Sequence, residues 1–444
     1  MTKKTILLLI PLAIAIGSVV ALFLVLLHLA IQWRFQHPWL LYFLPLAGVA
    51  IYYLYQQVGK SSEKGNNLIL EEIHRPAAGV PGSMAPIILF STVITHLFGG
   101  SAGREGTAVQ IGGSMAAQVG DYFKLPRQQK RLLLTCGMAA GFAAVFGTPF
   151  AGAIFAIEVL TLGRINYKAL LPGVGASLIA NFTVSAWGVR HTSYQIDEAV
   201  KVTYLWRNFF PSDLSLIIQI FGVAILFGLA SLLFAVLTQR LKLLFQSFIR
   251  VKWLIPVLGG LMLIAFTWIN GTPDYLSLGV DLEYAGAVTI STAFQAGGAD
   301  SWSWLWKTIY TSTTLATGFK GGEVTPLFYI GATLGNAVAT LIHAPISLFA
   351  ALGFLAVFAG ATKTPLASTV MGMEIFGPAY TLFFALACFT AYFFSSHMGI
   401  YNAQRRSRYS KRPGSNKPID RFLRYNHIKL DKYRFKFSGQ KKSK

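Results

Sequence analysis

A glutamate stands between glycines at the start of an apolar helical run, in the string Gly103-Arg104-Glu105-Gly106-Thr107. Glycines ahead of a helix leave backbone N–H groups uncovered, and the helix N-terminus adds positive potential. This spacing therefore predicts an anion site built without a full cation. A glutamate there can occupy the site as a tethered anion and leave it when protonated. The residues alone leave a second role open, a carboxylate that only caps its helix, although an acid at membrane depth favours function.

A second glycine-rich helix start lies in the other half of the chain, at Gly321-Gly322-Glu323-Val324-Thr325-Pro326. Pro326 suits the first turn of a helix. We expect the N–H groups of Val324 and Thr325, and the Thr325 hydroxyl, to face an anion. An ordinary N-cap by Thr325 is compatible with that role.

Two further features indicate no function when taken alone. The stretch Gly65-Asn66-Asn67 is typical of a turn that caps a short helix. Tyr401 stands at the edge of an apolar run, which is typical of an interfacial anchor. Only their positions relative to Glu105 give a reason to consider a function for either of them.

The composition places these residues in a membrane protein. The chain has 444 residues, of which 54% are hydrophobic and only 12% are charged, whereas a soluble domain carries about a quarter charged residues. An aromatic share of 14% excludes a disordered chain. Cys136 and Cys388 both lie in apolar runs, so we predict neither a disulfide framework nor a zinc site. The expected fold class is an all-α polytopic membrane protein.

Most of the excess positive charge lies in one C-terminal segment. The formal net charge is +21, and residues 403–444 hold 15 Lys and Arg against two acidic residues, a local net of +13. The positive-inside rule places such a segment in the cytoplasm, beside anionic lipid. Because the segment is short and unpatterned, we interpret its charge as topology and lipid attraction rather than as a nucleic-acid surface.

The apolar stretches predict spanning helices, several of them broken. A basic start, Met1–Lys4, leads into an uncharged run over Thr5–Trp33 that is too long for a signal peptide, so we expect a first span that begins in the cytoplasm. Both termini in the cytoplasm imply an even number of crossings. The uncharged run Val324–Thr362 must hold two helices, broken near Ala344-Pro345. Repeated Gly and Pro interruptions indicate a transporter or channel.

An internal repeat supports this interpretation over convergent packing of Gly/Ala-rich helices. At an offset of 216, identical residues are Gly137, Phe142, Thr148, Pro149, Ala151 and Glu158 against Gly353, Phe358, Thr364, Pro365, Ala367 and Glu374. Upstream, at an offset of 218, they are Gly103, Glu105, Thr107 and Gly113 against Gly321, Glu323, Thr325 and Gly331.

The two copies are expected to have opposite orientations. The loop over residues 124–131 carries four Lys and Arg, which favours the cytoplasm, whereas the equivalent loop over 341–347 carries none. Inverted repeats are typical of secondary transporters, with the binding site near the midplane between them. We expect a membrane transport domain over 1–403, with repeats over about 1–195 and about 205–403, and a basic cytoplasmic tail over 404–444.

These motifs resemble those of the CLC family of chloride channels and anion/proton antiporters, over nearly the whole chain up to about residue 403. The family has three anion-binding signatures, G-S-G-I-P, G-K/R-E-G-P and G-x-F-x-P, followed by a pore tyrosine. Their counterparts here are Gly65-Asn66-Asn67-Leu68-Ile69, Gly103-Arg104-Glu105-Gly106-Thr107 and Gly322-Glu323-Val324-Thr325-Pro326, with Tyr401 at the tyrosine position.

The departures from the family pattern resemble its fluoride-exporting branch. The chloride-coordinating serine position holds Asn66, the proline after the central motif is Thr107, and the phenylalanine of the third motif is Val324. The resemblance implies a gating and proton-carrying Glu105. It implies an anion-binding set of Asn66, Gly103, Arg104, Gly106, Thr107, Val324, Thr325 and Tyr401. It also implies fluoride export coupled to proton entry, by a homodimer with one pore per subunit in the plasma (inner) membrane.

The resemblance also bears on the proton route. In chloride/proton antiporters of the family, a second glutamate near the cytoplasmic side relays the proton, and Val159 takes that position here. Its neighbour Glu158 is interpreted as structural, because the repeat copies it as Glu374. The fluoride branch manages without that relay, so Val159 weakens the alternative of a chloride channel or chloride/proton antiporter.

Other classes of protein fit the sequence less well. An intramembrane enzyme needs a nucleophile with a base or a pair of metal ligands, and the eight histidines show no H-x-x-x-H spacing. A scaffold does not explain the repeated glycine-rich helix starts. There is no G-x-x-x-x-G-K loop, so we expect neither ATP hydrolysis nor any cofactor or metal.

Overall fold

The computed structural model describes residues 3–75, 79–163, 165, 167–197, 214–280 and 284–406. The described residues up to Arg405 form one compact unit. The segment between the two predicted repeats, and the predicted basic tail from residue 407 onward, lie outside the described residues.

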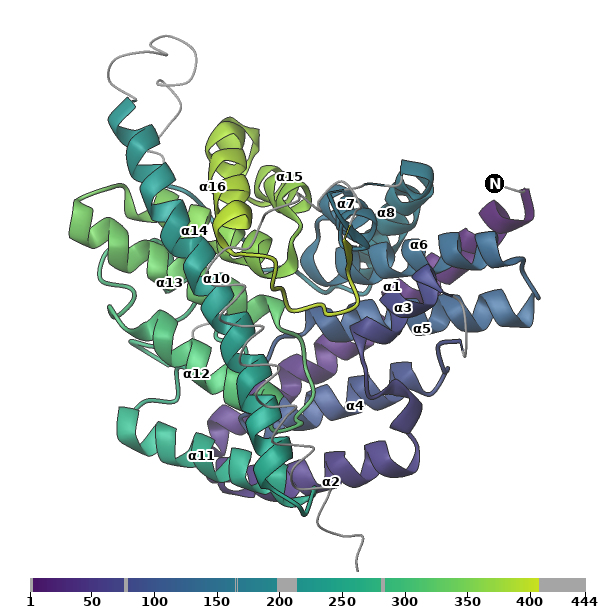
Figure 1. Ribbon diagram of the computed structural model, residues 1–444, viewed down its shortest axis with the longest axis horizontal. Coiled ribbons are helices and arrows are strands. Elements are labelled where there is room, and N and C mark those ends of the chain that lie inside the picture. Colours follow the sequence, from purple (N-terminus) through teal and green to yellow (C-terminus); the bar gives the residue numbers. More distant parts are fainter. Residues whose placement is uncertain are drawn as a thin grey trace, which may run out of the picture. The chain divides into compact units, whose positions relative to one another are not determined.

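The described chain is built almost entirely of helices (Figure 1). The α-helices of the first half are α1 (Lys3–Gln36), α2 (Leu44–Gln57), α3 (Asn66–His74), α4 (Met84–Leu97), α5 (Glu105–Tyr122), α6 (Arg127–Phe146), α7 (Pro149–Glu158) and α8 (Leu170–Ala186). Those of the second half are α10 (Leu214–Phe248), α11 (Leu254–Asn270), α12 (Ser303–Ala316), α13 (Val324–Ile342), α14 (Ile346–Thr362), α15 (Pro365–Phe376) and α16 (Thr381–Phe394).

Short elements connect them. The 3₁₀ turns are Pro38–Phe43, Lys60–Ser62, Tyr167–Ala169, Thr292–Phe294 and Pro378–Tyr380. Two two-residue strands, β1 (Thr161–Leu162) and β2 (Arg405–Arg406), complete the secondary structure of the described residues. The Arg405 N–H donates to the Leu160 carbonyl (3.2 Å). This bond ties the segment after α16 to the end of the first repeat.

Several helices have the length and composition of membrane spans. Five of those described are long and apolar enough to cross a membrane. The predicted first span is confirmed as α1, and the run Val324–Thr362 does hold two helices, α13 and α14, which break at residues 343–345. The prediction of an all-helical fold is therefore confirmed for the described residues.

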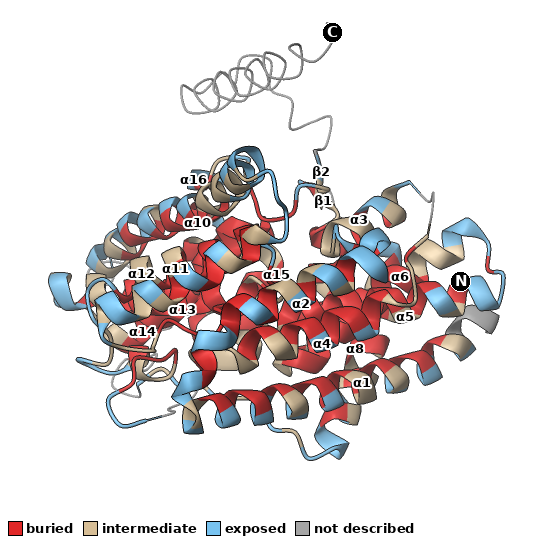
Figure 2. Ribbon diagram, turned by 90° about the horizontal axis from the view of Figure 1, so that it is seen from below, coloured by how far each residue is buried: buried red, intermediate tan, exposed pale blue. Residues whose placement is uncertain are grey.

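Burial separates an inner from an outer set of helices (Figure 2). In α14 every residue except Ile346 is buried, as expected for a helix that is apolar on all sides. By contrast, α1 and α10 expose large apolar side chains along one face, which suits contact with lipid. The inner helices are those that carry the repeat.

The two repeats pack against each other through matched capping contacts. Glu158, the last residue of α7, accepts hydrogen bonds from Leu366 N–H (3.0 Å) and Ala367 N–H (2.7 Å) at the start of α15. Glu374, near the end of α15, accepts from Phe150 N–H (3.0 Å) and Ala151 N–H (2.7 Å) at the start of α7. Each helix thus ends where the other begins, so they run antiparallel. These contacts agree with the structural interpretation of Glu158.

The upstream part of the predicted repeat alignment is wrong by one residue. Gly103 and Gly322 exchange two backbone hydrogen bonds of 2.6 Å in an antiparallel bridge, and the helices behind them begin at residues 105 and 324. The structural offset is therefore 219, not 218. Glu105 corresponds to Val324, and Glu323 corresponds to Arg104. In both copies an acidic residue lies two positions after a glycine, Glu105 after Gly103 and Glu323 after Gly321. Aligning these two acids produced the wrong register.

Candidate functional site

The site forms where the starts of α5 and α13 meet. Both helices begin at the Gly103–Gly322 bridge, so their N-termini converge from opposite repeats. Their macrodipoles therefore place two regions of positive potential side by side in the interior. This is the arrangement that the glycine-rich motifs predicted.

Glu105 fills the start of α13. Its side chain is 1% exposed, and its Oε2 accepts hydrogen bonds from Thr325 N–H (3.0 Å) and Arg104 N–H (3.1 Å). The Thr325 hydroxyl donates to its Oε1. The carboxylate of the first repeat therefore sits as an anion on the helix N-terminus of the second. It does not cap its own helix through an N2 or N3 amide.

Glycines allow this close approach. A Cβ on Gly103 would lie 2.7 Å from Glu105 Oε2 and 3.1 Å from Thr325 N, so any side chain would push the carboxylate off the amide. A Cβ on Gly106 would lie 3.1 Å from Asn66 Nδ2 and 3.1 Å from Gly322 Cα. Gly106 therefore lets the Asn66 amide approach the start of α5. Together, these two glycines keep both helix starts open to polar groups.

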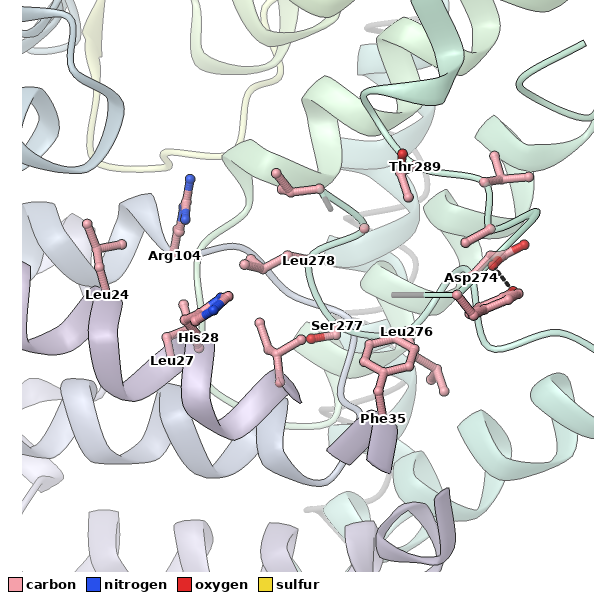
Figure 3. A pocket seen from close by; sticks show the side chains of 16 residues that line it. Leu24, Leu27, His28, Phe35, Arg104, Asp274, Leu276, Ser277, Leu278 and Thr289 are labelled. Carbon is pink, nitrogen blue, oxygen red and sulfur yellow. Dashed lines mark hydrogen bonds between the residues drawn. The ribbon is translucent and has the colours of Figure 1, made fainter. Parts of the chain in front are cut away.

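Arg104 faces outward from the same motif. Its Nε lies 3.9 Å from Glu105 Oε1, and its side chain is 21% exposed. It lines two cavities. One, of about 390 Å³ of empty space including open solvent, also contains Glu105 and Thr325 and is called here the Glu105 cavity. The other, of about 560 Å³, is lined by His28 of α1 and by the loop 274–289 (Figure 3). Arg104 thus lines both cavities, one of them together with Glu105.

Two predicted residues, Thr107 and Val324, face the site less directly. The Thr107 hydroxyl is paired with the Thr92 hydroxyl on α4 (2.7 Å), and no bond from it to Glu105 is found among the described residues. Val324 is 2% exposed and is the first residue of α13. It contributes the helix start rather than a side-chain donor.

Asn66 lies beside Gly106, at the start of α5. It begins α3, and Gly65 before it takes a left-handed φ of +56°, so the expected turn before a short helix is present. Its Oδ1 is buried without a hydrogen-bond partner. An amide with an unpaired oxygen beside a helix start is available to an incoming polar ligand.

Tyr401 is buried, so the alternative of an interfacial anchor is wrong. It is 7% exposed and lies edge-on to Phe155, with ring centroids 6.4 Å apart. Its hydroxyl lies within electrostatic range of the Glu323 and Glu105 carboxyls. The structure thus brings Tyr401 near the Glu105 site from a segment almost 300 residues away in the chain.

Backbone contacts fix the segment that carries Tyr401. The Ile400 N–H donates to the Ala361 carbonyl (3.0 Å), and the Ala403 N–H donates to Asn67 Oδ1 (2.9 Å). Asn67 follows Asn66 directly, so one hydrogen bond joins the first motif to the tyrosine segment. Asn67 was predicted only as a member of the first motif, with no role of its own.

Other polar residues near the site escaped prediction. Gln110 Oε1 is buried without a partner, and a Cβ on Gly65 would lie 3.4 Å from Gln110 Nε2. His191 lines the Glu105 cavity, and its Nε2 is buried without a partner. Gln110 follows the central motif by three residues on the same helix, which was a usable signal. His191 is a lone histidine in a loop, and no sequence pattern marks it.

Comparison with known proteins places the chain among anion transporters. The family model described as voltage gated chloride channel matches residues 47–396. The chain is 46% identical over 417 residues to a chloride/fluoride channel protein of Pseudomonas syringae pv. tomato, covering 94% of this chain and 89% of the relative. It is 28% identical over 294 residues to the H(+)/Cl(-) exchange transporter ClcA of Salmonella arizonae, covering 62% and 57%.

Solved structures share the fold. A crystal structure of a CLC-type fluoride/proton antiporter superposes with a TM-score of 0.84 at 34% identity, covering 92% of this chain and all of that one. A slow cyanobacterial Cl-/H+ antiporter superposes with a TM-score of 0.73 at 19% identity, covering 90% of this chain and 97% of the other. The second likeness concerns the fold alone.

Proposed function

This chain belongs to the voltage-gated chloride channel family, and on that premise we propose that it exports fluoride in exchange for protons. One observation carries the proposal: the Glu105 carboxylate occupies the start of α13, where it accepts hydrogen bonds from the Thr325 N–H and hydroxyl, and it also accepts one from the Arg104 N–H before α5. Donors that hold a carboxylate oxygen can hold another small anion in its place.

Competition for these donors couples the two ions. Ionised Glu105 and fluoride both require the start of α13, so they exclude each other. Protonation removes the charge of Glu105 and weakens its hydrogen bonds to the helix start, and the site then becomes free for fluoride. When fluoride leaves, the carboxylate returns and its proton departs on the other side. One side chain is thereby both the gate and the proton carrier.

The site suits an anion that is costly to dehydrate. A small, compact anion loses a large hydration energy on entering a low-dielectric interior, so hydrogen-bond donors must replace its water. Candidate donors are the Thr325 N–H and hydroxyl, the Asn66 amide and the Tyr401 hydroxyl. Gly103 and Gly106 keep the backbone close enough for these groups to converge. Arg104 adds positive potential at the outer approach.

The similarities favour fluoride over chloride. The relative at 46% identity is named for both chloride and fluoride and the solved structure at 34% identity for fluoride, whereas the chloride exchanger is 28% identical over 62% of this chain. A chloride channel or a chloride/proton antiporter is the alternative within the family. Val159, at the position of the second proton-relay glutamate, supports the first choice.

The topology and assembly follow from the same premise. We place the protein in the plasma (inner) membrane as a multi-pass homodimer with one pore per subunit and both termini in the cytoplasm. A membrane transport domain over 1–403, with repeats over about 1–195 and about 205–403, precedes a basic tail over 404–444 that meets anionic lipid. Loop 124–131 then faces the cytoplasm. No nucleic-acid partner and no enzymatic activity are proposed.

Purified protein in liposomes tests the proposal. Vesicles loaded with fluoride or with chloride are diluted into anion-free buffer while ion-selective and pH electrodes follow the outside. We expect fluoride to leave faster than chloride and the outside to become alkaline as protons enter. Chloride that leaves faster than fluoride would overturn the fluoride assignment. Rapid fluoride efflux without proton entry would indicate a channel.

A further inference from the structure

The cavity beside Glu105 contains a histidine that the proposed cycle does not yet use. His191 belongs to the segment 187–197 after α8, and it lines the Glu105 cavity together with Arg104, Glu105 and Thr325. Under the proposed topology, Lys168 lies at the cytoplasmic start of α8. The 17 residues of α8 span about 25 Å, so His191 lies toward the outer side.

The backbone around His191 fixes its ring. Gly147, the C-cap of α6, takes a left-handed φ of +75°, and a Cβ there would lie 2.6 Å from His191 Cδ2. The imidazole therefore packs flat against a position that only glycine leaves open. Its Nε2 is buried and has no hydrogen-bond partner. A fixed ring with an unpaired nitrogen in the same cavity as Glu105 is suited to exchange a proton with it.

The surroundings keep this imidazole neutral at rest. Burial and, to a smaller extent, the nearby Arg104 guanidinium lower the pKa of His191 to about 4, against a hydrogen bond with the Val145 carbonyl that raises it. The other titratable groups lining the cavity are Arg104 and Glu105 before and at the start of α5, and Tyr194 on the same segment. Helices α6, α13, α14 and α15 contribute only apolar side chains and the Thr325 hydroxyl.

We infer that His191 is the outer proton-transfer residue, which passes protons from the external solution to Glu105. The inference rests on the proposed function. The neutral Nε2 takes a proton from external water and becomes an imidazolium. The imidazolium gives that proton to a Glu105 carboxylate oxygen, which leaves a neutral imidazole and a neutral Glu105. No net charge is gained by His191 over the cycle, and the neighbouring Arg104 shortens the life of the charged form.

Two variants separate proton transfer from packing. His191→Gln keeps polar atoms near the ring position but carries no proton at neutral pH. His28→Gln is the matched control, because His28 lines the neighbouring cavity with Arg104 but not the Glu105 cavity. Both are reconstituted beside the unmodified protein, and fluoride-driven proton entry is recorded at mildly acidic and at alkaline external pH.

Proton scarcity sets the expected pH profile. We expect His191→Gln to slow exchange about tenfold at alkaline external pH, below the usual range for a positioned proton-transfer group because water can partly bypass it. The defect shrinks toward acidic external pH, where protons are abundant. His28→Gln stays close to the unmodified protein at both values. External imidazole is expected to restore exchange in His191→Ala, in which the ring is missing.

A second background identifies a merely structural role. In Glu105→Gln, fluoride flux no longer needs protons, so adding His191→Gln is expected to leave that flux unchanged. An equal slowing in this background, or a defect independent of external pH, would overturn the inference and indicate packing. If the unmodified protein shows no fluoride-driven proton entry at all, the proposed function fails instead. Normal exchange with an unaffected His191→Gln defeats only the role of His191.

Discussion

The two repeats contact each other at two pairs of equivalent helices, and the contact is symmetric in one pair and asymmetric in the other. At the α7–α15 contact, Glu158 and Glu374 cap each other's helices with matching distances of 3.0 and 2.7 Å. At the α5–α13 contact, Glu105 caps α13, but its counterpart Val324 returns no carboxylate to α5. The symmetric pair caps both helix starts with carboxylates. The asymmetric pair closes one with a movable group and leaves the other to Asn66.

On the proposed function, this difference distinguishes a structural contact from the transport site. A capping carboxylate that both repeats keep satisfies two orphan N–H groups at each end and has nothing to exchange with. A single carboxylate on one helix start can be displaced by one anion, because this contact has no second capping carboxylate. On the proposed function, the fold thus uses the same contact twice, once as a structural contact and once as the gate.

Removing the gate charge is expected to have the largest effect. Glu105→Gln cannot ionise, so proton movement coupled to fluoride should fall by about 10²-fold or more, the range for loss of a positioned proton-transfer group. Fluoride flux should persist as a passive leak. Simultaneous fluoride and pH recording from liposomes measures both. Proton movement that survives in Glu105→Gln would remove the role assigned to this residue.

Removing the Thr325 hydroxyl tests whether the start of α13 binds the transported anion. Thr325→Val deletes the hydroxyl that donates a hydrogen bond to Glu105. Because a hydrogen bond to a charged group contributes about 1.5–3 kcal/mol, fluoride exchange should slow roughly tenfold or more. Thr325→Ser keeps the hydroxyl and serves as the matched control. Initial rates of fluoride efflux give the comparison. Equal rates in the two variants would show that the hydroxyl does not contact the transported ion.

The symmetric pair should respond as a structural joint. Glu158→Gln and Glu374→Gln each lose a charge-assisted acceptor at one helix start, and each should destabilise the protein by about 1–3 kcal/mol. The two losses should be alike because the two contacts are alike. Thermal unfolding in detergent measures them. The ratio of protons to fluoride should not change in the folded fraction, and a changed ratio in either variant would mean that the joint takes part in proton transfer.

The smallest effect is expected at the bond between the first motif and the tyrosine segment. Asn67→Leu leaves the Ala403 N–H without its acceptor, at a cost of about 1 kcal/mol, or roughly fivefold in rate. Asn67→Asp keeps a side-chain oxygen at that place and should transport at nearly the unmodified rate. Fluoride efflux from matched liposomes tells them apart. A defect of equal size in Asn67→Asp would point to Asn67's amide nitrogen instead.

The sequence predicted the secondary-structure elements better than the alignment of the two repeats. The glycine-rich starts at Gly103 and Gly322, the break near Pro345 and the shared Glu158 and Glu374 all follow from local chemistry that neighbours in the chain reveal. The offset near Glu105 did not, because a one-residue shift keeps the glycine pattern and even pairs two acids. Only the hydrogen-bonded Gly103–Gly322 bridge decides between them.

Residues far apart in the chain were the hardest to assign. Tyr401 had the signal of an interfacial anchor, and its burial depends on the segment being held against α14 through Ile400. Thr107 follows the motif glutamate, yet its hydroxyl turns to Thr92 on α4. His191 lines the same cavity as Glu105, beside the left-handed glycine that ends α6. Each placement depends on a long-range contact that spacing does not encode.

The most direct test of fluoride/proton exchange is proton movement against its own gradient. Liposomes are loaded with fluoride at a lower internal than external pH, then diluted into fluoride-free buffer. The account predicts that protons still enter and the interior acidifies further, that chloride at the same gradient drives far less, and that Glu105→Gln drives none. Hydrogen fluoride leaking through lipid carries protons outward, so the direction separates the two. Protons that only run down their gradient, or leave with fluoride, would contradict the account.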